Sequence, residues 1–227
     1  DILTVLYESI LQLKDNKINA DKFILSKGHA ALALYVVLAH KKIITKKQLN
    51  SYCKINSLLE EHPSSKVNGI EASTGSLGHG LSIAAGIALA KKLQNNNSLI
   101  YVLMSDGECN EGSVWEAAMF AKTQKLNNLC AIVDFNKWQA TQRTKNIYSI
   151  TELRSKFNSF GWNSKIIDGH NHKEIYKDIN IFKKIFKSNT RPTIFLANTI
   201  KGKGVTFMHD DNNWHYRSVN KNELNLS

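Results

Sequence analysis

Two side chains with oxygen donors follow two predicted buried strands. The apolar runs at residues 99–104 (LIYVLM) and 129–135 (LCAIVDF) have the length of buried strands, and Asp106 and Asn136 lie just beyond their ends. Because parallel strands present their carboxyl ends at one edge of a sheet, we expect this carboxylate and this amide to converge if the two strands are neighbours. Hard oxygen donors of this kind suit Mg²⁺ or Ca²⁺, with phosphate oxygens completing the coordination shell.

The loop that follows Asp106 is suited to an anion. Gly107 and Gly112 permit close approach of the backbone. A helix predicted from about Ser113 to Lys125 would offer free N–H groups and the positive end of its dipole. An Asp-Gly pair is by itself typical of a turn. A second oxygen donor at a matching strand end favours a metal–diphosphate site instead.

The remaining chain alternates buried strands with helices, which predicts an α/β fold with a mostly parallel β-sheet and helices on both faces. The expected strands are residues 99–104, 129–135, 163–167 and 193–199. The expected helices are residues 2–13, 30–40, 46–60, 77–93, 113–125, 151–160 and 172–187, and residues 61–76 should form a loop. We expect a single domain over residues 1–227, because the chain has neither a repeat nor a low-complexity linker.

The composition excludes several classes of protein. No apolar run reaches the length of about 18 residues that a membrane-spanning helix needs, so we predict no membrane partner. The three cysteines, Cys53, Cys109 and Cys130, are widely spaced and odd in number, which excludes a disulfide framework. Unpaired cysteines favour a reducing compartment, and we predict a cytoplasmic protein.

The positive charge raises the hypothesis of a nucleic-acid-binding protein. The formal net charge is +11 and the isoelectric point is near 9.5. However, 26 of the 30 cationic residues are lysines, and 24 residues are asparagines. Nucleic-acid readers favour arginine, whose planar fork reads guanine and grips phosphate. We therefore attribute most of the charge to base-composition drift and solubility, and predict no nucleic-acid partner.

A longer pattern surrounds Asp106 and Asn136. An Asp-Gly pair, followed later by an apolar strand that ends in Asn, is the thiamine diphosphate motif, and the stretch DGECNEGSVWEAAMFAKTQKLNNLCAIVDFNKWQ (residues 106–139) resembles transketolases in particular. Four more blocks resemble successive transketolase blocks in the same order: LSKGHAALALYVVLA (25–39), EHP (61–63), IEASTGSLGHGLSIAAGIALA (70–90), and ANTIKGKGVTFM with WHYR (197–208, 214–217). Essentially the whole chain is similar to the N-terminal domain of transketolase, which holds the cofactor diphosphate.

The resemblance implies two ligands, thiamine diphosphate and Mg²⁺ (or Ca²⁺). It gives metal ligation to Asp106, to the side chain of Asn136 and to the backbone carbonyl of Trp138, a position that is usually aliphatic in the family. The residues that it places around the cofactor are His29, Gly75, Leu77, Asp106, Gly107, Glu111, Asn136, Lys201 and His215. Its catalytic residues are the histidines His29, His62 and His215, of which His62 would contact substrate hydroxyls. Ser105 stands where the family commonly has Gly, a change that we expect to be tolerated.

The implied activity is the transfer of a two-carbon ketol unit from a ketose phosphate to an aldose phosphate. The family's pyrimidine-binding domain, with its activating Glu, and its C-terminal domain are expected on a partner chain. This chain would then be the N-terminal subunit of a split transketolase. It would homodimerise within an α2β2 assembly and be active only with the C-terminal subunit.

Other interpretations stay open. The residues could be one part of a longer single-chain enzyme. The chain could also belong to another thiamine diphosphate enzyme that acts on sugars, such as a deoxyxylulose-phosphate synthase-like enzyme or a specialised ketolase. It could finally be a catalytically silent homologue.

Overall fold

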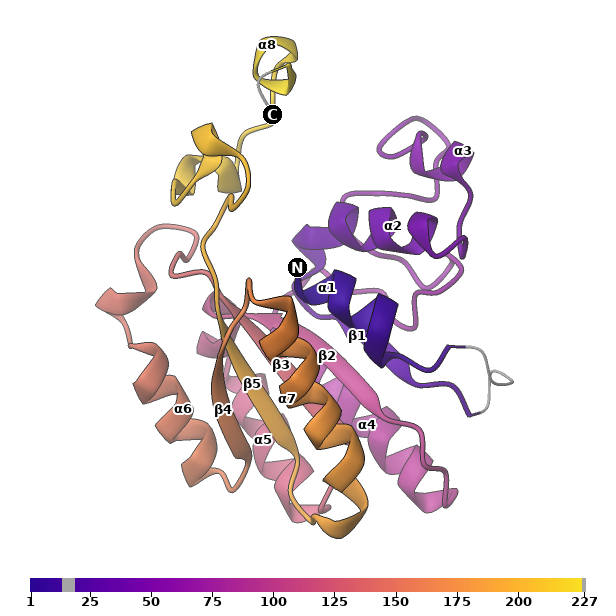
Figure 1. Cartoon of the computed structure of the whole chain (residues 1–227), viewed down its shortest axis with the longest axis vertical. Helices are drawn as coiled ribbons and strands as arrows, with labels where there is room; N and C mark the ends of the chain where they lie inside the picture. The colour runs from indigo at the N-terminus through magenta and orange to yellow at the C-terminus, as the bar shows by residue number, and fades with distance from the viewer. Residues whose placement is uncertain (14–18, 226–227) are drawn as a thin grey trace.

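Five parallel strands form the centre of the protein (Figure 1). The computed structural model describes residues 1–13 and 19–225. Within these residues the sheet has the order β1-β2-β3-β5-β4. The strands are β1 Lys22–Leu25, β2 Ile100–Ser105, β3 Leu129–Phe135, β4 Asn163–Asp168 and β5 Thr193–Asn198. The predicted parallel sheet is confirmed.

Helices cover both faces of this sheet. The α-helices are α1 Ile2–Val5, α2 Ala31–His40, α3 Lys46–Leu49, α4 Gly80–Leu93, α5 Gly112–Thr123, α6 Ile150–Ser159, α7 His172–Ile185 and α8 Lys221–Leu224. Successive residues of a strand point to opposite faces. Tyr101 and Leu103 of β2 therefore join an apolar cluster with α1, α2 and α7, whereas Val102 and Met104 join a second cluster with α4, α5 and α6. The two clusters are the two halves of the core.

One strand, β1, is not predicted from the sequence. Its four residues, KFIL, are too few for periodicity to distinguish a strand from a helix or a loop. The tertiary structure decides the question, because β1 pairs with the edge of β2 and places Phe23 opposite Tyr101. The pairing brings the loop that begins at Ser26 to the carboxyl edge of the sheet.

Two of the predicted helices end three or more residues earlier than expected. The helix expected over residues 46–60 is wrong beyond Leu49: α3 begins with a capping box at Thr45, but Cys53 and Asn56 adopt left-handed backbone angles of 53° and 63° in φ. Polar residues that favour turns follow Leu49, which explains the early end. The helix expected over residues 2–13 consists of α1 and a π-helical turn, Leu6–Ile10, and ends there.

The carboxyl ends of β1, β2, β3 and β5 lie at one edge of the sheet. Ser26, Asp106, Asn136 and Thr199 each follow one of these strands. This edge therefore collects the loops that the sequence singles out. Across residues 1–13 and 19–225, no helix has both the length and the apolar character needed to cross a membrane.

Candidate functional site

A small cavity of about 80 Å³ opens at the carboxyl edge of the sheet. Eight of the residues that the family resemblance assigns to the cofactor or the metal line it, together with three others. The lining residues are His29, Leu77, Ser105, Asp106, Gly107, Asn136, Trp138, Gln139, Ala140, Lys201 and His215. Residues that are far apart in the sequence thus converge on one hollow.

Asp106 is fully buried, with 0% of its surface exposed. Its Oδ2 accepts hydrogen bonds from the Thr144 hydroxyl (2.6 Å) and the backbone N–H of Lys137 (3.2 Å), and its Oδ1 accepts one from the N–H of Gly107 (3.0 Å). Burial raises the pKa of Asp106 to about 6, although the hydrogen bonds from Thr144 and Gly107 and the charge of Lys27 oppose the shift. No cationic side chain of the described residues forms an ion pair with Asp106, so this carboxylate would gain from a bound cation.

The other two proposed metal ligands lie beside Asp106. Asn136 and Trp138 line the same cavity, and the Asn136 amide oxygen accepts a hydrogen bond from the N–H of Trp138 at 2.9 Å. A group of three or more His, Cys, Asp or Glu side chains able to hold a metal is absent from the described part of the chain. A carboxylate, an amide oxygen and a backbone carbonyl form a mixed oxygen set, which fits a hard divalent cation.

A second buried carboxylate, that of Glu108, ties three loops together. Its Oε1 accepts hydrogen bonds from the Ser26 hydroxyl and from the N–H of Gly78 at 2.9 Å, and its Oε2 accepts one from the N–H of Ser105 at 3.2 Å. The Ser105 hydroxyl in turn accepts from the N–H of Glu108 at 3.3 Å. Ser105 therefore helps to hold the Asp106 loop. Glu108 is not identified from the sequence.

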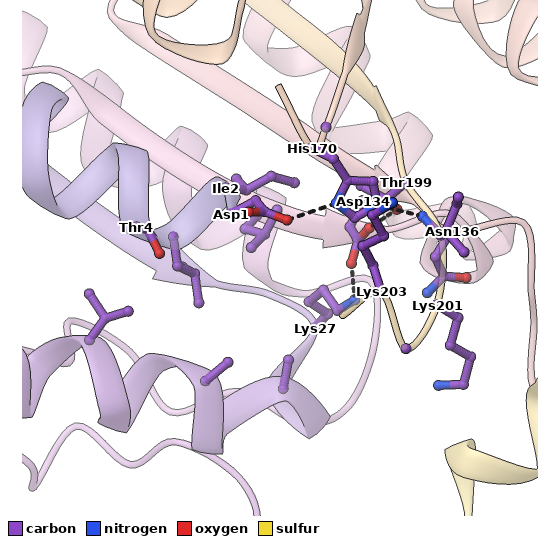
Figure 2. A pocket seen from close by; sticks show the side chains of 18 of the residues that line it. Asp1, Ile2, Thr4, Lys27, Asp134, Asn136, His170, Thr199, Lys201 and Lys203 are labelled. Carbon is purple, nitrogen blue, oxygen red and sulfur yellow. Dashed lines mark hydrogen bonds and ion pairs between the residues drawn. The ribbon is translucent and has the colours of Figure 1, made fainter. Parts of the chain in front are cut away.

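An ion pair between buried Lys27 and half-buried Asp134 lies next to the cavity, in the wall of a larger pocket of about 540 Å³ (Figure 2). The Lys27 ammonium is 2.6 Å from Oδ2 of Asp134, and the Thr199 hydroxyl donates a hydrogen bond to the other oxygen. Burial alone would raise the pKa of Asp134, but the Lys27 charge and these hydrogen bonds outweigh it and lower the pKa. The larger pocket and the cavity share Asn136 and Lys201, so the two hollows adjoin.

The histidines of the cavity face one another. The rings of His29 and His215 have centroids 5.4 Å apart. Partial burial, followed by the charges of Lys27, His215, Lys201 and His62, lowers the pKa of His29 to about 3, even though part of the residue is exposed to solvent. Burial and the Lys201 and Lys27 charges also lower the pKa of His215. Both rings are therefore neutral at pH 7 and can each donate and accept one hydrogen bond.

Three of the assigned residues lie outside the cavity lining. Gly75 contacts the ring of His62: a Cβ added to Gly75 would lie 2.8 Å from the His62 Cδ2. Glu111 is exposed and lies against Gly78. These contacts all involve the loop at residues 75–78, which reaches the cavity through Leu77. The structure thus places these residues beside the cavity without giving them a contact inside it.

Close approach of two loops shapes this part of the site. A Cβ added to Gly28 would lie 2.8 Å from the Cα and the N of Gly75. Only a residue without a side chain allows the loop after β1 to touch the loop before α4. The contact places His29 next to the stretch that carries Leu77.

Three residues that hold the site together, Lys27, Asp134 and Thr144, were not identified from the sequence. Asp134 carried a signal, because it is the only charged residue in the apolar run 129–135. Lys27 and Thr144 carried none, since a lysine or a threonine in a loop is ordinarily solvated. Their partners, Asp134 and Asp106, are 107 and 38 residues away along the chain.

Comparison with known proteins agrees with this arrangement. Residues 1–227 match the family described as "Transketolase, thiamine diphosphate binding domain". The chain belongs to this transketolase family. Its predicted family membership and fold are therefore confirmed, and the domain that it represents is one that binds thiamine diphosphate.

The chain matches most of the length of some transketolase relatives and about a third of others. It is 38% identical over 219 residues to an apulose-4-phosphate transketolase subunit of Phocaeicola vulgatus, covering 95% of this chain and 77% of that protein. It is 37% identical over 211 residues to a 6-deoxy-6-sulfo-D-fructose transketolase subunit of Clostridium sp. (strain MSTE9), covering 91% and 76%. The crystal structure of Campylobacter jejuni transketolase superposes with a TM-score of 0.84 at 29% identity, covering 93% of this chain but 34% of that one.

Proposed function

We propose that this transketolase domain binds the diphosphate end of thiamine diphosphate together with Mg²⁺ or Ca²⁺ and acts as the N-terminal subunit of a two-chain transketolase. The observation that carries the proposal is the convergence of Asp106, Asn136, Trp138, His29 and His215 on one cavity. Asp106 would provide the only carboxylate of the metal site. The Asn136 amide and the Trp138 carbonyl would complete the protein's share of the coordination shell.

A lysine in the cavity wall and a second in the adjoining pocket support an anionic ligand. Lys201 lines the cavity, and burial together with the charge of Lys27 lowers the pKa of its ammonium. A phosphate group near these two lysines would offset their mutual repulsion. Gly107 and Leu77 would contact the cofactor beside them, with Gly75 on the same loop.

The chain's own residues have a limited part in the chemistry. Bound thiamine diphosphate supplies the carbanion chemistry of ketol transfer. The neutral rings of His29 and His215 are suited to donate and accept hydrogen bonds at substrate hydroxyls. His62 would orient the substrate from the neighbouring loop, and Glu111 would face the partner chain.

A partner chain would supply the activating Glu and the rest of the active site. The chain covers about three quarters of two relatives that are named as transketolase subunits, which supports a separate C-terminal subunit. We infer an α2β2 assembly in which this chain also homodimerises. The three free cysteines are compatible with a reducing compartment, and we place the assembly in the cytoplasm.

The substrate is proposed only as a class. A ketose phosphate donor and an aldose phosphate acceptor, as in the pentose phosphate reactions, fit the family. The two relatives that are named as subunits carry the names of different sugars, so a specialised sugar ketolase is the second candidate.

Calorimetry tests the metal and cofactor assignment directly. The wild-type chain and Asp106→Ala should be titrated with thiamine diphosphate, each with Mg²⁺ and with a chelator, in the presence of the candidate partner chain. We expect Mg²⁺-dependent binding in the wild type and a loss of affinity of roughly 10- to 100-fold in the variant. Equal affinity in the two proteins would refute the metal site. Absence of two-carbon transfer from xylulose 5-phosphate to ribose 5-phosphate in the mixed chains would refute the activity but not the site.

A further inference from the structure

The segment after β5, residues 200–216, carries both Lys201 and His215 to the cavity. We call it the capping segment; it rises from the carboxyl edge of the sheet (Figure 1). It contains two 3-10 turns, Thr206–Met208 and Asn212–His215, and none of its residues is buried. Apolar packing alone therefore cannot hold it in place, so polar contacts must contribute.

One residue of the capping segment, Asp210, makes most of the polar contacts with the loop after β3. Its carboxylate receives two hydrogen bonds from the Arg143 guanidinium, at 2.6 and 2.8 Å. The Trp138 Nε1–H lies 2.9 Å from Oδ1 of Asp210 and 3.1 Å from its backbone carbonyl. The N–H of Asp210 also donates to the carbonyl of Lys201 at 2.8 Å. Asp210 thus links the outer loop to the backbone of a cavity residue.

Arg143 and Trp138 also contact each other. The Arg143 Cζ lies 3.6 Å from the centroid of the Trp138 ring, and the backbones of the two residues form an isolated antiparallel bridge. The guanidinium is thus stacked on one side chain while it makes a two-pronged hydrogen bond to another. The three residues form a closed triangle in which each member contacts the other two.

The backbone at two points of this arrangement is unusual. Lys137, directly before Trp138, has φ of 74°, and Asp210 itself has φ of 57°. Residues other than glycine adopt this region infrequently, and surrounding contacts must hold them there.

The loop after β3 accepts two more hydrogen bonds from the capping segment. The carbonyl of Ala140 accepts one from the Asn212 side-chain amide and one from the Tyr216 hydroxyl, both at 3.0 Å.

We propose that Trp138, Arg143 and Asp210 form a latch that holds the capping segment, and with it Lys201 and His215, over the cavity. The proposal rests on the proposed function in that it treats the cavity as the cofactor site. The three side chains are positioning residues that act through Lys201 and His215. An aliphatic side chain at position 138 has neither an indole N–H nor a ring face, so the latch depends on the tryptophan at this position.

Hydrogen exchange tests the latch without any cofactor. Peptides that cover residues 200–216 should be compared by mass spectrometry in the wild type, Trp138→Leu, Trp138→Phe and Asp210→Asn. We expect exchange of the Asp210 amide to become about tenfold faster in Trp138→Leu and Asp210→Asn. Trp138→Phe, which retains a ring but loses the N–H donor, should be intermediate. The latch side chains are half-buried, and the melting temperature of each variant shows that it is folded.

Cofactor affinity tests the consequence of the latch. In calorimetry with thiamine diphosphate, Mg²⁺ and the partner chain, we expect Trp138→Leu and Asp210→Asn to bind roughly tenfold more weakly. Arg217→Gln is the matched control, because Arg217 also stacks on a tryptophan, Trp214, at 4.2 Å, but is paired with Glu223 and not with the loop after β3. The control should match the wild type in affinity and in the exchange of Asp210.

The outcomes separate the latch from the function. Unchanged exchange in Trp138→Leu and Asp210→Asn overturns the latch, as does faster exchange with unaltered cofactor affinity. If the wild type itself does not bind thiamine diphosphate, the proposed function is refuted, and the exchange result alone decides whether these side chains hold the segment.

Discussion

The carboxylate of Glu108 accepts a hydrogen bond from the N–H of Gly78, 2.9 Å away, and so joins loops that are 30 residues apart in the chain. The same oxygen accepts from the Ser26 hydroxyl, 82 residues before it. One fully buried side chain thus holds together the loops after β1, before α4 and after β2. These loops carry His29, Leu77 and Asp106, so the geometry of the cavity depends on a residue that does not line it.

Replacement of Glu108 tests this dependence. In Glu108→Gln, the amide NH₂ must face an N–H or hydroxyl donor, and we expect the free energy of unfolding to fall by about 1–3 kcal/mol. Thiamine diphosphate affinity should fall as well, because Leu77 and Asp106 lose their common anchor. Urea unfolding and calorimetry measure the two effects. The control is Glu116→Gln on the exposed side of α5, which should change neither. Wild-type stability in Glu108→Gln would contradict the assigned hydrogen bonds.

The Lys27–Asp134 pair joins a buried ammonium to a half-buried carboxylate. Lys27→Met leaves the Asp134 carboxylate without its ammonium partner, and we expect a loss of about 1–3 kcal/mol in the free energy of unfolding, between the values typical of exposed and of fully buried pairs. Adding Asp134→Asn removes the unpaired charge, so the double variant should be more stable than the sum of the two single losses predicts. Urea unfolding of the four proteins at pH 7 gives the coupling energy.

An exposed ion pair provides the comparison for this cycle. Lys41 and Glu8 lie 3.2 Å apart at the surface. Lys41→Met should cost less than about 1 kcal/mol. Strict additivity of the Lys27 and Asp134 losses would show that the two residues do not interact in solution.

Acid should destabilise the cofactor-free protein through His29. The pKa of His29 is lowered to about 3 in the folded protein, whereas the unfolded chain takes up the proton near the ordinary value of 6.5. Between these values the unfolded state binds more protons, so the free energy of unfolding falls as the pH falls below about 6.5. In His29→Asn this contribution disappears, and the decline should be shallower. Because solvent reaches part of the residue, the difference in slope should be modest.

Urea unfolding at intervals from pH 7 to pH 4.5 measures this difference. The slope should not vanish in His29→Asn, because the pKa values of His170 and His215 are also lowered, in each case first by burial. Identical slopes for His29→Asn and the wild type would show that the His29 ring is fully solvated.

The sequence by itself determined the class of fold and most of the cavity lining. The apolar runs that became β2 and β3 predict a parallel sheet, and Asp106 and Asn136 fall just beyond their ends by the geometry of such a sheet. The ordered blocks around His29, Leu77, Lys201 and His215 identified the family and led to residues that share one cavity. These features could be predicted because they depend on local periodicity and on short motifs.

Only the tertiary structure decided which polar groups are buried and what each one contacts. β1 exists because the edge of β2 pairs with it, and Lys27 is buried because Asp134 lies opposite. Glu108 and Asp210 gain their roles from donors 30 and 72 residues away. The hydrogen bonds of a polar side chain in a loop can be made either to water or to a protein partner. The residues next to it in the sequence are the same in both cases. The choice is made by folding, which brings the distant partner close enough to replace the lost water.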